Sequence, residues 1–174
     1  MNLKPQDVLV LLKLVAIGEQ PWAYNSLAVD LGMSPSEVHS AIKRALVAGL
    51  AVKKADTIAP NIRNLEEFLI HGIRYVFIPE RGQMSRGRLT AHAGPPLAQH
   101  FIADQEPPPV WPDAEGMDRG IEFSPLYKSA PQAAMKDPAL YELLALVDAI
   151  RGGRAREREL AIKEIRKRLE HYAW

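Results

Sequence analysis

Three arginines stand close together in the middle of the chain, and their side chains suggest anion binding. Arg81, Arg86 and Arg88 lie in one short segment that contains two glycines and no acidic residue. A guanidinium group binds phosphate oxygens through paired hydrogen bonds. We predict that the segment is a turn. It reaches a nucleic-acid backbone or minor groove, or it is a solvated basic turn, or its arginines pair with Glu66 and Glu67.

The histidines do not have the spacing of a metal site. Of the five histidines, His71, His92 and His100 are far apart in the sequence, and the chain has no cysteine. Protein metal sites usually combine closely spaced histidine, cysteine or carboxylate ligands. The chain also lacks a P-loop, a GxSxG turn and a GxGxxG turn. We therefore expect no metal, no cofactor and no enzymatic activity.

The composition favours a small globular protein. The 174 residues suit one domain with extensions, or two very small domains. Hydrophobic residues make up 47% of the chain and aromatic residues only 7%, so aliphatic side chains must fill the core. No apolar stretch is long enough to cross a membrane, and no signal peptide is evident. The net charge of +1 requires any nucleic-acid surface to be local. We expect a cytoplasmic protein without membrane contact.

The clearest start of a helix lies at Ser34. The sequence SPSE at 34–37 places serine at the N-cap, proline at the first helical position and glutamate at the third, which is a capping box. The following apolar residues recur with helical spacing until Gly49. A short extended segment, residues 50–54, comes next.

Two further helices are predicted before this one. The first begins near Pro5 and ends at Gly18. The second runs from about Tyr24 to Leu31, and Gly32 stops it. The N-terminal part of the chain is therefore predicted to be three helices joined by tight turns.

The remaining chain divides into two parts. Residues 81–136 are rich in proline and glycine, which predicts an irregular segment wrapped around the body. Residues 137–174 are predicted to form two helices, an apolar one starting at Asp137 and an amphipathic one from about Arg154 to Tyr172. The apolar helix either packs in the core of its own chain or joins two copies in a dimer.

Residues 23–52 resemble the helix-turn-helix of winged-helix transcription regulators, such as the MarR, IclR and Lrp-type families. Ala28 is small where the next helix crosses closely, Gly32 permits a sharp turn, and Val38 locks the second helix against the first. The matching residues are Leu27-Ala28, Leu31-Gly32-Met33-Ser34, Val38 and Ala48-Gly49-Leu50.

The resemblance implies a mostly α fold. A winged helix-turn-helix domain would occupy residues 1–80, followed by the Pro/Gly-rich wrapped loop and the C-terminal helical pair. Only residues 50–54 look extended where a wing is expected. The wing is therefore either short, or completed by residues 74–78, whose aromatic and β-branched side chains predict a strand.

The resemblance also implies that the helix beginning at Pro35 enters the major groove of DNA. Its outward side chains would meet base edges and phosphates, and Arg44→Ala would weaken binding without disturbing the fold. Glu37 could cap the helix or accept a hydrogen bond from a cytosine amino group. The predicted DNA-binding residues are Asn25, Ser34, Ser36, Glu37, His39, Ser40, Lys43, Arg44, Lys53, Lys54, Arg81, Arg86 and Arg88.

The function predicted from the sequence is sequence-specific binding of double-stranded DNA by a homodimer. The protein would act as a bacterial transcriptional regulator, and more specifically as a repressor that occupies its operator. The alternative is a protein-interaction module, such as an antitoxin-like partner of a co-encoded protein. In that case the Pro-rich segment and the C-terminal helices would supply the contact.

Overall fold

Glycines and a capping box set the boundaries of the N-terminal helices. The computed structural model describes residues 1–102 and 105–172. Helix α1 (Pro5–Ile17) ends at Gly18, and α2 (Tyr24–Leu31) ends at Gly32, whose φ of 65° is left-handed. Helix α3 (Pro35–Val47) begins where the Ser34 hydroxyl accepts a hydrogen bond from the Glu37 amide at 3.1 Å. The predicted boundaries of these three helices are confirmed.

A two-stranded hairpin follows α3. Strand β1 (Ala51–Lys54) pairs antiparallel with β2 (Thr57–Pro60), which comes directly after it in the sequence. Residues 74–78 do not complete this hairpin, so their prediction as a strand was wrong. They overlap a short helix, α5 (Ile73–Val76). Ile73 in this helical turn is buried, and the ring centroids of Phe77 and Phe68 lie 6.2 Å apart.

Residues 81–136 were predicted to be irregular, but they contain three strands and a helix. Strand β3 (Arg81–Leu89) pairs antiparallel with both β4 (Pro109–Pro112) and β5 (Asp118–Phe123), and β4 pairs parallel with β5. Glycine makes this closure sterically feasible, because a Cβ at Gly87 would overlap the carbonyl oxygen of Trp111 in β4, and a Cβ at Gly120 would overlap that of Pro108, just before β4. Two short 3₁₀ helices, η1 (Ala91–Ala93) and η2 (Leu97–His100), follow β3.

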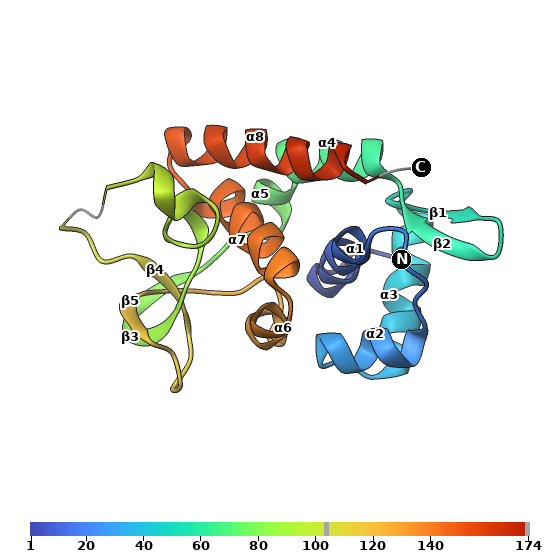
Figure 1. Cartoon of the computed structure of the whole chain (residues 1–174), viewed down its shortest axis with the longest axis horizontal. Coiled ribbons are helices and arrows are strands. Elements are labelled where there is room, and N and C mark those ends of the chain that lie inside the picture. Colours follow the sequence, from blue (N-terminus) through green and yellow to red (C-terminus); the bar gives the residue numbers. More distant parts are fainter. Residues whose placement is uncertain (103–104, 173–174) are drawn as a thin grey trace.

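The C-terminal helices form the centre and one side of the molecule. Helix α6 (Ala130–Lys136) leads into α7 (Pro138–Gly152), and α8 (Ala155–Glu170) packs along α7. Residues 143–151 of α7 are all buried, and this helix contacts α1, α6 and α8. Of the two predicted uses of this apolar helix, the structure shows packing in the core of its own chain. Helix α4 (Ile62–His71) lies beside α8 (Figure 1).

A buried polar network joins the three-stranded unit to α7. One carboxylate oxygen of Asp148 accepts hydrogen bonds from the Thr90 hydroxyl at 2.7 Å and from the Trp111 indole at 2.8 Å. The other oxygen accepts from Arg151 at 2.7 Å, and Arg151 also donates to the carbonyl of Phe77 at 2.8 Å. Because unpaired buried charges are costly, this network fixes the position of the sheet against the helix.

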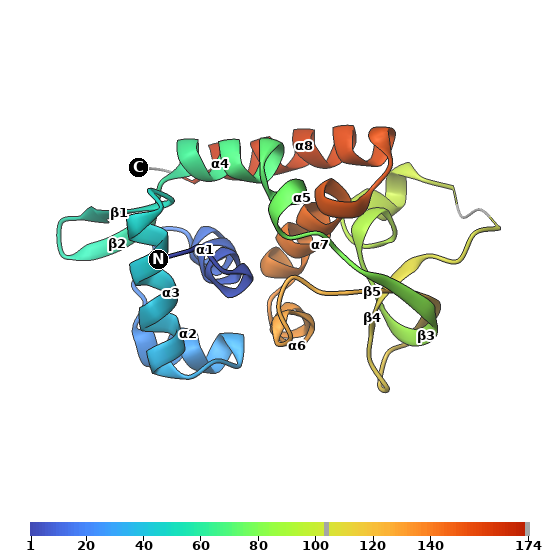
Figure 2. The same ribbon diagram turned by 180° about the vertical axis from the view of Figure 1, so that it is seen from behind.

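The two ends of the molecule carry different structures. Figures 1 and 2 show α2, α3 and the β1–β2 hairpin at one end, the β3–β4–β5 unit at the other, and α6 and α7 between them. Helices predominate in the described part of the chain, as predicted, and small sheets make the fold a mixture of α and β. None of the described helices is long and apolar enough to cross a membrane.

Candidate nucleic-acid interface

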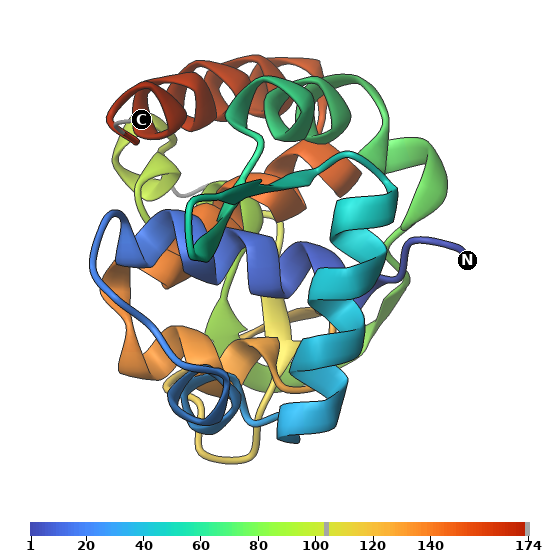
Figure 3. The ribbon, with the colours of Figure 1, turned by 90° about the vertical axis from the view of Figure 1, so that its right-hand side faces the viewer.

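Helix α3 has one buried face and one face that no other element covers. Its apolar residues, Val38, Ala41, Ile42 and Ala45, are buried against the rest of the domain. The opposite side exposes three residues spaced for one helical stripe, Ser36, Ser40 and Lys43, with His39 beside them. Figure 3 shows α3 at the edge of this end of the molecule.

An aromatic stack holds His39 on this face. The Tyr24 and His39 rings lie 3.6 Å apart between centroids and are inclined by only 7°. The edge of Trp22 packs on Tyr24 at 5.2 Å. A stacked ring loses little further freedom when it binds a ligand, so the side chain is oriented in advance. Tyr24 was not among the predicted site residues, because its contact depends on how α2 crosses α3.

Ser34 and Glu37 serve the structure of the helix. The Glu37 carboxylate accepts a hydrogen bond from the Ser34 amide at 2.7 Å and another from the Tyr127 hydroxyl at 3.3 Å. The hydrogen bonds from Ser34 hold the pKa of Glu37 below its usual range, and Tyr127 adds to the effect. Of the two predicted roles for Glu37, the structure shows helix capping. The bond to Tyr127 also joins α3 to the segment before α6.

Arg44 is not part of the uncovered face. Its guanidinium makes two hydrogen bonds to the fully buried carboxylate of Asp7, with Nε–Oδ2 and Nη2–Oδ1 distances of 2.8 Å each. Hydrogen bonding to Asp7 raises the pKa of Arg44. The prediction that Arg44 could be removed without disturbing the fold does not fit this pair, because its loss would leave Asp7 buried without a counter-charge.

Other predicted contacts lie at the same end of the molecule as α3. Asn25 is exposed in the first turn of α2, and Lys53 and Lys54 are exposed on β1 near the tip of the hairpin (Figure 3). Lys43 on α3 is a further exposed ammonium group at this end of the molecule. Amide and ammonium groups of this kind can bind phosphates.

The three arginines of β3 are not brought together with α3. They lie on a strand, and not on a turn, in the unit at the opposite end of the molecule (Figure 1). Arg88 pairs with Asp113 at 2.8 Å, and Arg81 donates to the carbonyl of Gly152 at 2.7 Å. Arg86 is exposed. A single interface formed by α3 and these arginines is therefore excluded within one chain.

No protein-family model, curated protein or solved structure matches this chain. Its function must be inferred from its own residues.

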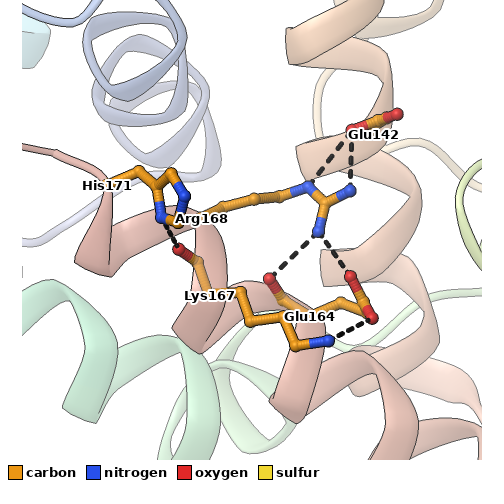
Figure 4. Close-up of polar contacts among 5 residues, drawn as sticks. All are labelled: Glu142, Glu164, Lys167, Arg168 and His171. Atoms are coloured by element: carbon orange, nitrogen blue, oxygen red, sulfur yellow. Dashed lines mark hydrogen bonds and ion pairs between the residues drawn. The ribbon is translucent and has the colours of Figure 1, made fainter.

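A second polar cluster lies between α7 and α8. Arg168 donates to Glu142 at 2.8 Å and to Glu164 at 2.7 Å, and Lys167 lies 3.4 Å from Glu164 (Figure 4). Although burial alone would lower the pKa of Arg168, the two carboxylates raise it. Glu142, Lys167, Arg168 and His171 border a cavity of about 430 Å³. Because the charges neutralise one another, the cluster fits a clamp that holds α8 on α7.

A third polar group surrounds a cavity of about 520 Å³ beside η2 and the start of α8. His92 lies 3.5 Å from Glu157, and Arg154 pairs with Glu106 at 2.6 Å. The Arg154–Glu106 contact pairs opposite charges within the chain. No group of three or more metal-ligating side chains is found in residues 1–102 and 105–172.

Proposed function

We propose that residues 1–80 form a winged helix-turn-helix unit that binds double-stranded DNA sequence-specifically. In this proposal α3 is the recognition helix and the β1–β2 hairpin is the wing. The observation that supports it is the uncovered polar face of α3, in which His39 is held in place by its stack on Tyr24. The hairpin follows α3 directly, and its two lysines are exposed at the same end.

The residues divide into those that read bases and those that bind phosphates. Ser36, His39 and Ser40 lie in the N-terminal half of α3, which is the part of a recognition helix that meets base edges. Lys43 lies one turn further along and suits a phosphate. Lys53 on the hairpin suits the phosphates of the neighbouring strand or groove. The proposed function includes no catalytic step.

The regulatory part of the proposal is repression by occupancy of an operator. A homodimer would match a pseudo-palindromic operator, as twofold proteins do. Helix α7 is buried within its own chain, so another surface would have to join the two copies. Light scattering of the purified full chain, with and without DNA, measures the stoichiometry.

The experiment compares binding to two DNA duplexes. Fluorescence anisotropy would measure the affinity of the full chain for the DNA upstream of its own gene and for a scrambled duplex, across a range of salt. The wild-type protein is expected to bind the upstream duplex more tightly. Lys43→Ala should weaken binding to both duplexes by about 1 kcal/mol. The slope of log affinity against log salt concentration should fall by about the amount expected for one phosphate contact.

The variants include a matched control. Lys163→Ala removes an exposed lysine of α8 and should leave both affinities unchanged. His39→Ala should lower the preference for the upstream duplex more than it lowers binding to the scramble. Equal binding to both duplexes by the wild type would contradict sequence-specific recognition. Absence of binding at low salt would contradict the DNA-binding role of α3 altogether.

One observation favours a second candidate function, contact with a co-encoded protein. Tyr75, Val76 and Ile78 are 69%, 57% and 70% exposed at the end of α5, and the partly buried Phe77 stands between Val76 and Ile78. Exposed apolar side chains that lie together often mark a protein-binding surface. Co-expression with the neighbouring gene product tests this function. Ile78→Ser should abolish copurification and leave DNA binding unchanged, whereas copurification of the variant would contradict it.

A further inference from the structure

Two arginines face each other across strands β3 and β5. In the antiparallel pairing of these strands, Arg86 is the register partner of Arg119. Directly opposite residues project to the same side of a sheet, with Cβ atoms about 5 Å apart. Both side chains are exposed. We propose that Arg86 and Arg119 form a phosphate-binding site that takes the backbone of a nucleic acid, separate from α3.

The other arginines of this unit have partners, and these two do not. Arg88 pairs with Asp113, and Arg81 donates to a main-chain carbonyl. Within the described part of the chain, neither the Arg86 nor the Arg119 guanidinium forms a hydrogen bond or an ion pair. Their donors are therefore available to a ligand that bears several oxygen acceptors.

The acidic residues nearby do not neutralise the pair. Asp118 is the register partner of Gly87, one position along each strand, so its side chain projects to the other side of the sheet. Asp113 is occupied by Arg88. Like charges directly opposite each other destabilise a sheet. A phosphate bound between the two guanidinium groups would remove this repulsion and form charge-assisted hydrogen bonds.

The strands that carry the pair cannot move apart easily. Gly87 and Gly120 stand next to the two arginines and hold β3 and β5 close to the β4 segment. A Cβ at Gly87 would overlap the carbonyl oxygen of Trp111 in β4, and a Cβ at Gly120 would overlap that of Pro108, just before β4. Strand β3 is paired on both sides, with β4 and with β5. A rigid backbone fixes the distance between the Cβ atoms of Arg86 and Arg119. A site in which both side chains bind one anion requires such a fixed distance.

The surroundings favour a nucleic-acid backbone over a small anion. Met84 and Ile121 form the next cross-strand pair on the same side of the sheet, and Met84 is 43% exposed. Met117, just before β5, is 90% exposed. Apolar side chains beside two guanidinium groups match the alternation of sugars and phosphates in a nucleic acid. The site lies at the other end of the molecule from α3, so one chain could hold two segments (Figure 2).

The experiment removes the arginines from a protein whose α3 is already weakened. In the full-length Lys43→Ala background, anisotropy would measure binding to a labelled DNA duplex for Arg86→Gln, Arg119→Gln and the double variant. Each single change should weaken the remaining binding about fivefold. Arg63→Gln removes an exposed arginine of α4 and should have no effect. If the double variant and this control bind the duplex equally well, the proposal of a phosphate site at Arg86 and Arg119 is wrong.

This site and the proposed function of α3 can fail separately. Loss of binding in the arginine variants, with no effect of Lys43→Ala or His39→Ala, would support the Arg86–Arg119 site and contradict the role of α3. The reverse pattern would support α3 and contradict the arginine site.

A second readout distinguishes the source of the phosphate. Without ligand, Arg86→Gln and Arg119→Gln should each raise the midpoint of urea denaturation. The double variant should raise it little further, because either single change already removes the repulsion between the two guanidinium groups. Inorganic phosphate, compared with chloride at equal ionic strength, should raise the midpoint of the wild type less than duplex DNA does. If inorganic phosphate alone stabilises the wild type and DNA does not, the nucleic-acid assignment is overturned.

Discussion

Asp7 and Arg44 form a buried ion pair that joins the first turn of α1 to the last turn of α3. Two hydrogen bonds of 2.8 Å connect the carboxylate with the guanidinium, and the Lys4 amide donates to the same carboxylate at 2.8 Å. Asp7 has no exposed surface. The pair therefore fixes the angle at which α3 leaves the domain, and its integrity is a condition for any function of the exposed face of α3.

Removal of the Arg44 side chain is expected to lower the stability of the domain. Arg44→Gln should lower the free energy of unfolding by about 3 kcal/mol, because the carboxylate of Asp7 stays buried without its counter-charge. Urea denaturation followed by circular dichroism measures the loss. Lys43→Gln, one residue away and exposed, should change the free energy by less than about 0.5 kcal/mol.

A double-mutant cycle separates the pair from its surroundings. Replacing both residues, as in Asp7→Asn with Arg44→Met, should cost less than the sum of the two single changes, because no unpaired charge remains. Additive losses would mean that the two side chains do not interact in solution, and the structural role assigned to Arg44 would be wrong.

Arg44 also shows what sequence patterns leave undetermined. Its place near the end of a capped amphipathic helix was predicted correctly, and that position is compatible with an exposed side chain. The pattern contains no information about Asp7, which lies far away in the sequence and reaches Arg44 only when α1 packs on α3. Local signals such as Ser34 and Gly32 were sufficient for the helix boundaries, because capping and turn geometry depend on a few adjacent residues.

Gly32 should tolerate asparagine better than alanine. Its φ of 65° lies in the left-handed region, where a residue with a Cβ costs about 1 kcal/mol. An added Cβ would lie 3.4 Å from the Cβ of Ser129, an ordinary contact, so the backbone conformation dominates the effect. Gly32→Ala should lower the thermal midpoint, and Gly32→Asn should lower it less. Equal losses would show that crowding by Ser129 decides the result.

The stability of the protein should depend on the charge of Asp137 at low pH. Burial alone would raise the pKa of this carboxyl, but hydrogen bonds from Lys13 and from the Leu140 amide hold it below its usual range. A lowered pKa stabilises the folded state above the unfolded-state value of roughly 3.9. This contribution is lost as the pH falls through the lower pKa of the folded state.

Asp137→Asn tests this dependence, since asparagine also caps helices well and the change removes mainly the charge. The difference in unfolding free energy between wild type and variant should be constant near neutral pH and shrink below about pH 4. Asp30 also approaches Lys13, at 3.7 Å, but is half exposed, so Asp30→Asn should change the pH profile little. A difference that stays the same at low pH would contradict the lowered pKa.

The three-stranded unit was the largest departure from the sequence prediction. Proline and glycine in residues 81–136 suggested an irregular loop, because they break regular patterns of hydrophobic residues. In the structure Gly87 and Gly120 are the residues that let the strands close on one another. The opposition of Arg86 and Arg119 depends on the strand register, which a β-bulge between Arg81 and Met84 shifts. Neither the bulge nor the register could be read from the spacing.

In the proposed DNA-binding function, Tyr24 should control sequence preference through His39. Their rings are stacked at 3.6 Å, so the tyrosine limits the orientations of the imidazole on the exposed face. Tyr24→Ala should lower the preference for the upstream duplex over the scramble about fivefold, because His39 must then be ordered on binding. Tyr24→Phe keeps the ring and should retain the preference. Tyr75→Ala, which removes an exposed tyrosine on α5, serves as the control. A Tyr24→Ala variant that folds normally and discriminates between the duplexes as the wild type does would show that the stack plays no part in recognition.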